Sequence, residues 1–152
     1  FGNIVKEAVG ERKLIRAIAY VVRTESKEEQ PFFEALYKLG IETREKDLQI
    51  FAGGMKKADW DVGLAVDAIR LSSSLDAIVL VSGDGDYLPL VEYLQKSTGK
   101  QVEVVAFSET TSSKLIEEAD SFLDLSEHKQ KFLMTDRRMA AQYRKRKTTK
   151  KK

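Results

Sequence analysis

The segment at residues 76–92 constrains the fold most, because its sequence changes from strand-like to helix-like within a few positions. Its apolar run, residues 77–81, stops at Ser82-Gly83, and two carboxylates, Asp84 and Asp86, follow with one glycine between them. A proline three positions later begins a stretch with helical spacing. The pattern predicts a buried strand, a tight turn and a helix start. In open α/β sheets, ligands bind outside the carboxyl ends of the strands, so such a fold would place its chemistry at this turn.

Strand-like and helix-like segments alternate along the rest of the chain. Beside the strand at 76–81, strands are predicted at 14–22, 41–51, 101–107 and 122–125, and helices at 3–11, 26–39, 59–72, 87–96 and 110–119. This alternation predicts parallel βαβ units. We therefore expect an α/β fold, a three-layer α/β/α sandwich with a mainly parallel sheet and Rossmann-like topology. Right-handed crossovers would bring the carboxyl ends of the strands to one edge of the sheet.

The composition excludes several kinds of site. The chain has 152 residues, enough for one domain with a core, and contains no cysteine, which rules out disulfides, thiolate zinc sites and cysteine nucleophiles. Its one histidine, His128, lies in a charged segment, so a Ser-His-Asp triad is not credible. No apolar run approaches the roughly 18 residues that span a membrane. We expect a cytoplasmic protein.

Charge is distributed unevenly between the body and the C-terminus. Nine lysines and arginines follow Asp136, and no acid does. Without those nine, the 26 basic residues fall to 17 against 24 acidic ones, a formal charge of about −7 for the body. We expect a globular domain at 1–126 and a basic tail at 127–152, partly helical or disordered. The tail either binds a polyanion or is a solvated extension that keeps the protein soluble.

A second acidic segment precedes the strand at 76–81. Asp59 is a plausible helix N-cap, Asp61 lies in the first turn of the helix, and Asp67 follows six residues later. Six residues turn the helix by about 240°, so Asp61 and Asp67 do not share a face. Carboxylates gathered at the strand ends would repel one another unless a cation lay between them. Oxygen ligands suit Mg²⁺ or Mn²⁺.

Simpler explanations exist for each acid alone. Asp84 and Asp86 can be read as ordinary turn and N-cap residues, which Asp favours, and Trp60 more often packs at a helix edge than stacks on a base.

Three known motifs do not fit the turn. An EF-hand loop that starts at Asp84 fails, because its twelfth position is Gln95, and the Gly-Lys-Ser/Thr ending of a P-loop is absent. The Asp-x-Asp nucleophile motif of haloacid-dehalogenase-type phosphatases matches poorly, because Ser82-Gly83 separates the strand from the first acid. The combination of acids carries the signal.

The two acidic segments together resemble the LabA/DUF88 group of NYN domains, which are PIN-like. The first matching stretch is Phe51-Ala-Gly-Gly-Met-Lys-Lys-Ala-Asp-Trp-Asp61-Val-Gly-Leu-Ala-Val-Asp67. The second is Val79-Leu-Val-Ser-Gly-Asp84-Gly-Asp86-Tyr-Leu-Pro-Leu. Their order and spacing fit across roughly residues 10–125. The resemblance implies a PIN-like α/β/α sandwich with a metal-dependent ribonuclease site.

The resemblance also implies residue roles. Asp61, Asp84 and Asp86 would be catalytic and metal-binding, Asp67 would be a further acid of the metal site, and Ser82 and Gly83 would support the turn. The family's first strand normally supplies an Asp and a nearby Asn, and no segment here matches it. We expect that strand to lie ahead of Phe1. Lysines and arginines would bind RNA backbone: Lys56, Lys57, Arg144, Lys145, Arg146 and Lys147.

Three functions follow as hypotheses. The first is a Mg²⁺- or Mn²⁺-dependent ribonuclease that hydrolyses RNA phosphodiester bonds. The second is a non-catalytic nucleic-acid-binding or regulatory module of the same fold. The third, which the residues support least, is a phosphatase. We expect RNA as the partner, no membrane association, and a homodimer as one option for the assembly.

Overall fold

The computed structural model describes residues 1–23, 30–50, 56–57 and 59–132. Its helices are α1 (Gly2–Val9), α2 (Gln30–Lys38), α3 (Asp61–Ser72), α4 (Leu88–Lys96), α5 (Ser113–Glu118) and α6 (Lys129–Phe132). Its strands are β1 (Ile18–Arg23), β2 (Glu42–Asp47), β3 (Gln49–Ile50), β4 (Lys56–Lys57), β5 (Ala77–Leu80), β6 (Gln101–Ala106) and β7 (Ser121–Asp124). Three short 3-10 helices follow strand ends: η2 (Gly85–Tyr87), η3 (Ser108–Thr110) and η4 (Leu125–His128). The predicted alternation of strands and helices is confirmed.

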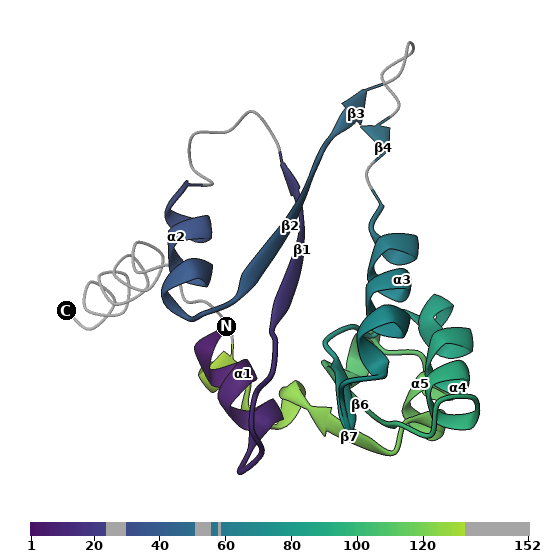
Figure 1. Cartoon of the computed structure of the whole chain (residues 1–152). Helices are drawn as coiled ribbons and strands as arrows, with labels where there is room; N and C mark the ends of the chain where they lie inside the picture. Colours follow the sequence, from purple (N-terminus) through teal and green to yellow (C-terminus); the bar gives the residue numbers. More distant parts are fainter. Residues whose placement is uncertain (24–29, 51–55, 58, 133–152) are drawn as a thin grey trace, which may run out of the picture.

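The parallel pairing is also confirmed, and it falls into two groups. Strands β5, β6 and β7 form one sheet in that order, and both of its pairings are parallel. Strands β1 and β2 form a second parallel pair, with Ile18 opposite Glu42. Strands β3 and β4 form a short antiparallel pair. Figure 1 shows the β1–β2 pair rising beside the part of the molecule that contains β6, β7 and the helices α3 to α5.

Helices cover both faces of the β5–β6–β7 sheet, which makes this part a three-layer α/β/α arrangement. One face packs with α3, α4 and α5 around a core that contains Leu80, Val91, Leu94, Val102, Val104 and Leu115. The other face packs with α1 and α6 around Val105, Leu125 and Phe132. Residues of β6 alternate between these two cores, as the period of a β-strand requires. The sandwich fixes where the carboxyl ends of all three strands lie.

The β1–β2 pair contacts this sandwich through the N-terminal half of α3. The Trp60 indole N–H donates to the Val21 carbonyl at 3.0 Å, and the ring packs edge-on against Tyr20 at 5.4 Å between centroids. Lys46 places its ammonium 4.5 Å from the centre of the Trp60 ring. The prediction that Trp60 packs at a helix edge is confirmed.

The beginning of the predicted tail lies against the body. Phe132 is buried in the second core, Lys131 forms an ion pair with Glu7, and the Asn3 amide donates to the Lys131 carbonyl at 2.8 Å. The domain boundary at residue 126 stays a prediction. Residues 133–152, with the basic residues Arg144, Lys145, Arg146 and Lys147, lie outside the described part of the chain. Within that part, no helix has the length and apolar character needed to cross a bilayer.

Candidate functional site

The turn after β5 holds the first two predicted acids at the carboxyl edge of the sheet. Asp84 caps η2, since its Oδ1 accepts the backbone N–H of Asp86 at 3.0 Å. The Ser82 hydroxyl accepts the backbone N–H of Asp84 at 3.2 Å, so Ser82 shapes the turn through the backbone. Both Asp84 and Asp86 are exposed. The turn and cap roles predicted for Asp84 are therefore present, and both carboxylates remain accessible to a ligand.

Tyr87 joins the second acidic segment to this turn. Its ring is buried, and its hydroxyl donates to Asp61 Oδ1 at 2.7 Å. Burial raises the pKa of Tyr87 well above its usual value, and the hydrogen bond to Asp61 and the nearby charges of Asp61, Asp84 and Asp59 raise it further. The phenol therefore stays protonated and acts as a donor. Asp61, 23 positions before Asp84 in the sequence, thus contacts the 3-10 helix that Asp84 caps.

Asp59, the predicted N-cap of α3, lies one residue ahead of the observed N-cap, Trp60, but its side chain still bonds the first turn of the helix. Its Oδ1 accepts the backbone N–H of Asp61 at 2.8 Å, which satisfies one of the free donors at a helix N-terminus. Its carbonyl oxygen accepts from the Lys46 ammonium at 2.7 Å. These bonds hold Asp61 at the first position of the helix, beside Tyr87.

Asp67 faces a different part of the molecule. Its carboxylate accepts from the Tyr20 hydroxyl at 3.1 Å and forms ion pairs with Arg44 at 3.5 Å and Arg70 at 3.8 Å. Burial and this hydrogen bond raise the pKa of Tyr20 to about 12. Asp67 therefore links α3 to the β1–β2 pair. The structure brings Asp61 and Asp84 together and places Asp67 elsewhere, as the 240° rotation along the helix suggests.

The donor set near Tyr87 is carboxylate oxygen, which suits a hard divalent cation. In the part of the chain that is described, no three Asp, Glu or His side chains lie close enough to hold a metal ion. The residues present thus supply ligands of the right chemistry but not a full set. A further ligand would be needed to complete it.

The predicted nucleic-acid-binding residues are only partly placed. Lys56 and Lys57 form β4, whose partner strand is β3, and α3 begins four residues after this hairpin. In Figure 1 the hairpin projects beyond the N-terminal end of α3. The four basic residues at 144–147 lie outside the described residues.

One part of the site was missed by sequence reasoning. The loop that follows β6 lies directly against the turn of residues 82–86, which holds Asp84 and Asp86 and is called the acid turn below. The backbone N–H of Ser112 donates to the Gly83 carbonyl at 3.0 Å. A Cβ atom at Gly83 would lie 2.6 Å from Thr111 Oγ1. Two features of the sequence belong to this contact, namely the two glycines of the turn and the run of hydroxyl residues at 110–113. Neither feature indicates which segment it contacts.

Comparison with known proteins identifies the family. The family model described as NYN domain matches residues 1–126. The chain belongs to the NYN domain family. The resemblance seen in the two acidic segments is thereby confirmed, and the NYN fold accounts for the mixed parallel α/β architecture.

Two similar proteins can be named. The chain is 28% identical over 123 residues to the low amplitude and bright protein LabA of Synechococcus elongatus, an alignment that covers 77% of this chain and 66% of LabA. The chain therefore spans just under two thirds of LabA. It is also similar to a crystal structure of VPA0982, a protein of unknown function from Vibrio parahaemolyticus. That match has a TM-score of 0.74 and 34% identity, and covers 82% of this chain and 77% of the other.

Proposed function

We propose that this NYN domain is a metal-dependent ribonuclease that hydrolyses RNA phosphodiester bonds. The observation that carries the proposal is the contact of Asp61 with the turn of Asp84: Asp61 accepts from the hydroxyl of the buried Tyr87, which lies in the 3-10 helix that Asp84 caps. Two acidic segments far apart in the sequence thus meet at the carboxyl end of β5, the edge where open α/β sheets bind ligands. NYN domains are in general nuclease-type domains that use divalent metals, which fits this chemistry.

Asp61 and Asp84 would hold Mg²⁺ or Mn²⁺, with Asp86 as a further ligand or as the group that orients the attacking water. When bound, such a metal activates water and neutralises charge that develops on the phosphodiester. The Tyr87 hydroxyl bonds one oxygen of Asp61 and so fixes the orientation of this carboxylate. Asp59 fixes the backbone of the same residue. The chain's own contribution is to hold two acids in place at an open edge.

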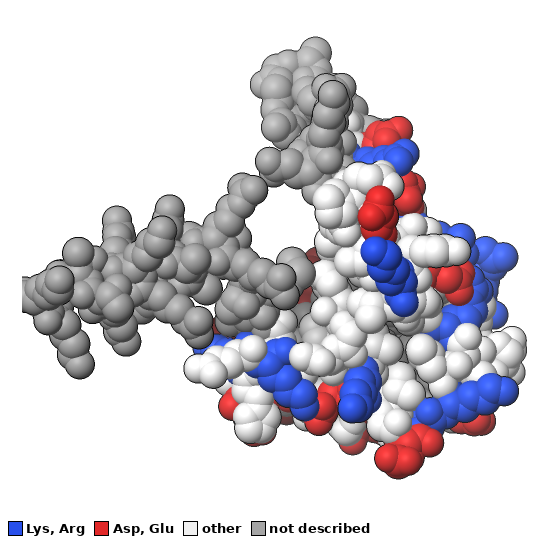
Figure 2. Space-filling view, turned by 90° about the vertical axis from the view of Figure 1, so that its left-hand side faces the viewer, with Lys and Arg blue, Asp and Glu red and all other residues white. Residues whose placement is uncertain are grey.

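The exposure of Asp84 and Asp86 favours a polymer as substrate. Enzymes that act on small molecules usually enclose most of the ligand in a cleft. An open edge instead admits a chain that continues on both sides of the scissile bond, which argues against the phosphatase hypothesis. Figure 2 shows acidic and basic side chains interspersed over the described residues of one face. RNA binding would therefore depend on local basic groups, namely Lys56 and Lys57 and the tail residues 144–147.

The decisive assay is cleavage of single-stranded RNA by the full-length protein, with Mn²⁺ and with chelator. We expect products with Mn²⁺ only, and their loss in Asp84→Asn. Asp76→Asn serves as the matched control, because Asp76 is exposed and precedes β5 at its opposite end. Equal loss of RNA with and without chelator, or full activity in Asp84→Asn, would disprove the proposal.

A second candidate is a nucleic-acid-binding module without catalysis. It is favoured by the bonds that Asp61 and Asp84 already make, since a hydrogen bond to tyrosine and a helix cap explain both acids structurally. This alternative predicts salt-sensitive RNA binding that survives Asp84→Asn and yields no products.

A further inference from the structure

The loop after β6 packs against the acid turn. Besides the bond from Ser112 to Gly83, the two segments are in close contact at both glycines of the turn. A Cβ atom at Gly83 would lie 3.1 Å from the Thr111 Cα, and one at Gly85 would lie 2.9 Å from Ser112 Oγ. Any ligand seated on Asp84 and Asp86 would therefore also lie beside this loop.

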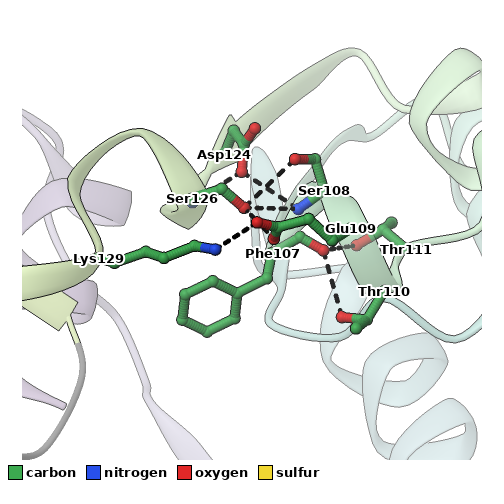
Figure 3. Close-up of polar contacts among 8 residues, drawn as sticks. All are labelled: Phe107, Ser108, Glu109, Thr110, Thr111, Asp124, Ser126 and Lys129. Carbon is green, nitrogen blue, oxygen red and sulfur yellow. Dashed lines mark hydrogen bonds and ion pairs between the residues drawn. The ribbon is translucent and has the colours of Figure 1, made fainter.

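Hydrogen bonds join the loop to the next strand end and connect residues within the loop. The backbone N–H of Ser108 donates to Asp124 Oδ1 and to Ser126 Oγ, both at 3.1 Å. The Thr111 hydroxyl donates to the Phe107 carbonyl at 2.8 Å, and the Thr110 hydroxyl donates to the same carbonyl at 3.3 Å. Figure 3 shows these contacts at the ends of β6 and β7. A surface that is ordered beforehand loses less conformational entropy when a ligand binds.

The one acid of this loop is neutralised within the same network. Glu109 forms an ion pair with Lys129 and accepts from the Ser126 hydroxyl at 2.5 Å. The bond to Lys129 holds the pKa of Glu109 below its usual value, so this carboxyl group stays ionised. Figure 3 shows the Glu109 carboxylate directed toward Lys129 and Ser126. The charge of the loop's own acid is thus compensated by Lys129 of α6.

The exposed groups that remain suit a sugar–phosphate chain. Thr110, Ser113 and Lys114 are all exposed, and Lys114 takes part in none of the ion pairs found among the described residues. Hydroxyl groups and lysines are the usual partners of phosphate and sugar oxygens, which they bind without reading the bases. We propose that residues 110–114 bind the backbone of the RNA strand next to the acid turn, with Lys114 on a phosphate.

This inference rests on the proposed function for the identity of its ligand, but its test does not require catalysis. The probe is a fluorescently labelled single-stranded RNA, with binding followed by anisotropy in chelator across a salt series. Lys114→Ala should bind several-fold more weakly, and its dependence of log K on log salt should be shallower by about 0.7, the value for one phosphate contact with a single strand. Ser113→Ala should weaken binding less, because it removes a neutral contact.

Lys100→Ala is the matched control. Lys100 directly precedes β6, at the sheet edge opposite the acid turn, and should leave affinity and salt slope unchanged. Equal affinity and slope in Lys114→Ala and the wild type would overturn the inference, as would absence of RNA binding by the wild type. RNA binding that depends on Lys114 without cleavage would refute only the ribonuclease. Cleavage with binding independent of Lys114 would refute only the role of the loop.

Discussion

At the scale of single residues, Tyr87 accounts for most of what distinguishes this site from an ordinary turn. An aspartate after a strand is common, and an aspartate in the first turn of a helix is common too. The buried phenol connects the two, because its hydroxyl donates to Asp61 and its residue lies in the 3-10 helix that Asp84 caps. Burial raises the pKa of Tyr87, and the bond to Asp61 and the charges of Asp84 and Asp59 raise it further. A donor that cannot ionise near neutral pH keeps the Asp61 carboxylate oriented.

Asp124 should make the free energy of unfolding depend on pH in the acid range. Hydrogen bonds from Ser108, and then from Ser126, lower the pKa of Asp124 to about 2 in the folded protein. Because an unfolded aspartate titrates near pH 4, this contribution to stability is fully present above about pH 4 and is lost as the pH falls toward 2. Asp124→Asn should therefore unfold less steeply with acid than the wild type between these values, as measured by denaturant unfolding at several pH values. Parallel pH profiles would contradict the assignment.

Gly83 should tolerate no side chain, for reasons of contact and not of backbone angle. Its φ is not positive, but an added Cβ would lie 3.1 Å from Thr111 Cα and 3.2 Å from the Thr110 carbonyl oxygen. Backbone atoms cannot move away as easily as a side chain. We expect Gly83→Ala to lower the free energy of unfolding by about 1–3 kcal/mol, the usual cost of overpacking.

Gly85→Ala is the comparison for that substitution, because its added Cβ would meet only the Ser112 side chain. The loss of stability should be smaller at Gly85 than at Gly83, as measured by urea unfolding. An equal or larger loss at Gly85 would show that contact with the loop backbone is not the cause.

At the scale of elements, α3 is the link between the two groups of strands. Its core side contributes Leu64, Ala65 and Ala68 to the sandwich, and Asp67 reaches Tyr20 on β1 and Arg44 on β2. These contacts give Asp67 a structural role, whereas the family resemblance alone would assign it to the metal site. They also place the beginning of α3, and with it Asp61, relative to both sheets.

Tyr20→Phe tests that link. Removal of the hydroxyl should cost about 1 kcal/mol of unfolding free energy at neutral pH, the usual value of a hydrogen bond, and should leave Mn²⁺ binding unchanged. The pKa of Tyr20 is raised to about 12 in the folded protein, so its neutral form contributes fully below about pH 10 and loses its contribution as the pH rises toward 12. The stability difference between wild type and variant should shrink over that range. A constant difference, or weaker Mn²⁺ binding, would contradict a structural role.

The sequence predicts most elements because their periodicity is strong. It predicts the first residue of an element wrongly where contacts with other residues determine that start. Residues 14–17 are apolar enough for a strand, yet β1 begins at Ile18, where pairing with β2 starts. The helix predicted from Thr110 begins only at Ser113, because the hydroxyls of Thr110 and Thr111 bond the Phe107 carbonyl. Side-chain hydrogen bonds of this kind compete with helix formation. The helix expected with Asp59 as its N-cap begins at Asp61, with Trp60 as the N-cap.

At the scale of the whole molecule, the order of elements was predictable and their meeting points were not. Alternating strands and helices imply parallel strands whose carboxyl ends share an edge, and β5, β6 and β7 agree. No periodicity indicates that Tyr87 would join two acidic segments, or that the loop after β6 would lie on Gly83. The separation of the parallel strands into two sheets was equally absent from the pattern. These contacts depend on residues far apart in the chain.

The most direct test of the central claim is Mn²⁺ binding by the full-length protein, measured by titration calorimetry. If Asp61 and Asp84 belong to one metal site, the wild type binds the ion, and Asp61→Asn and Asp84→Asn each weaken it by about tenfold or more, since a charged ligand is lost. Asp76→Asn, at the opposite end of β5, should bind as the wild type does. Unchanged affinity in either Asp61→Asn or Asp84→Asn would contradict the account.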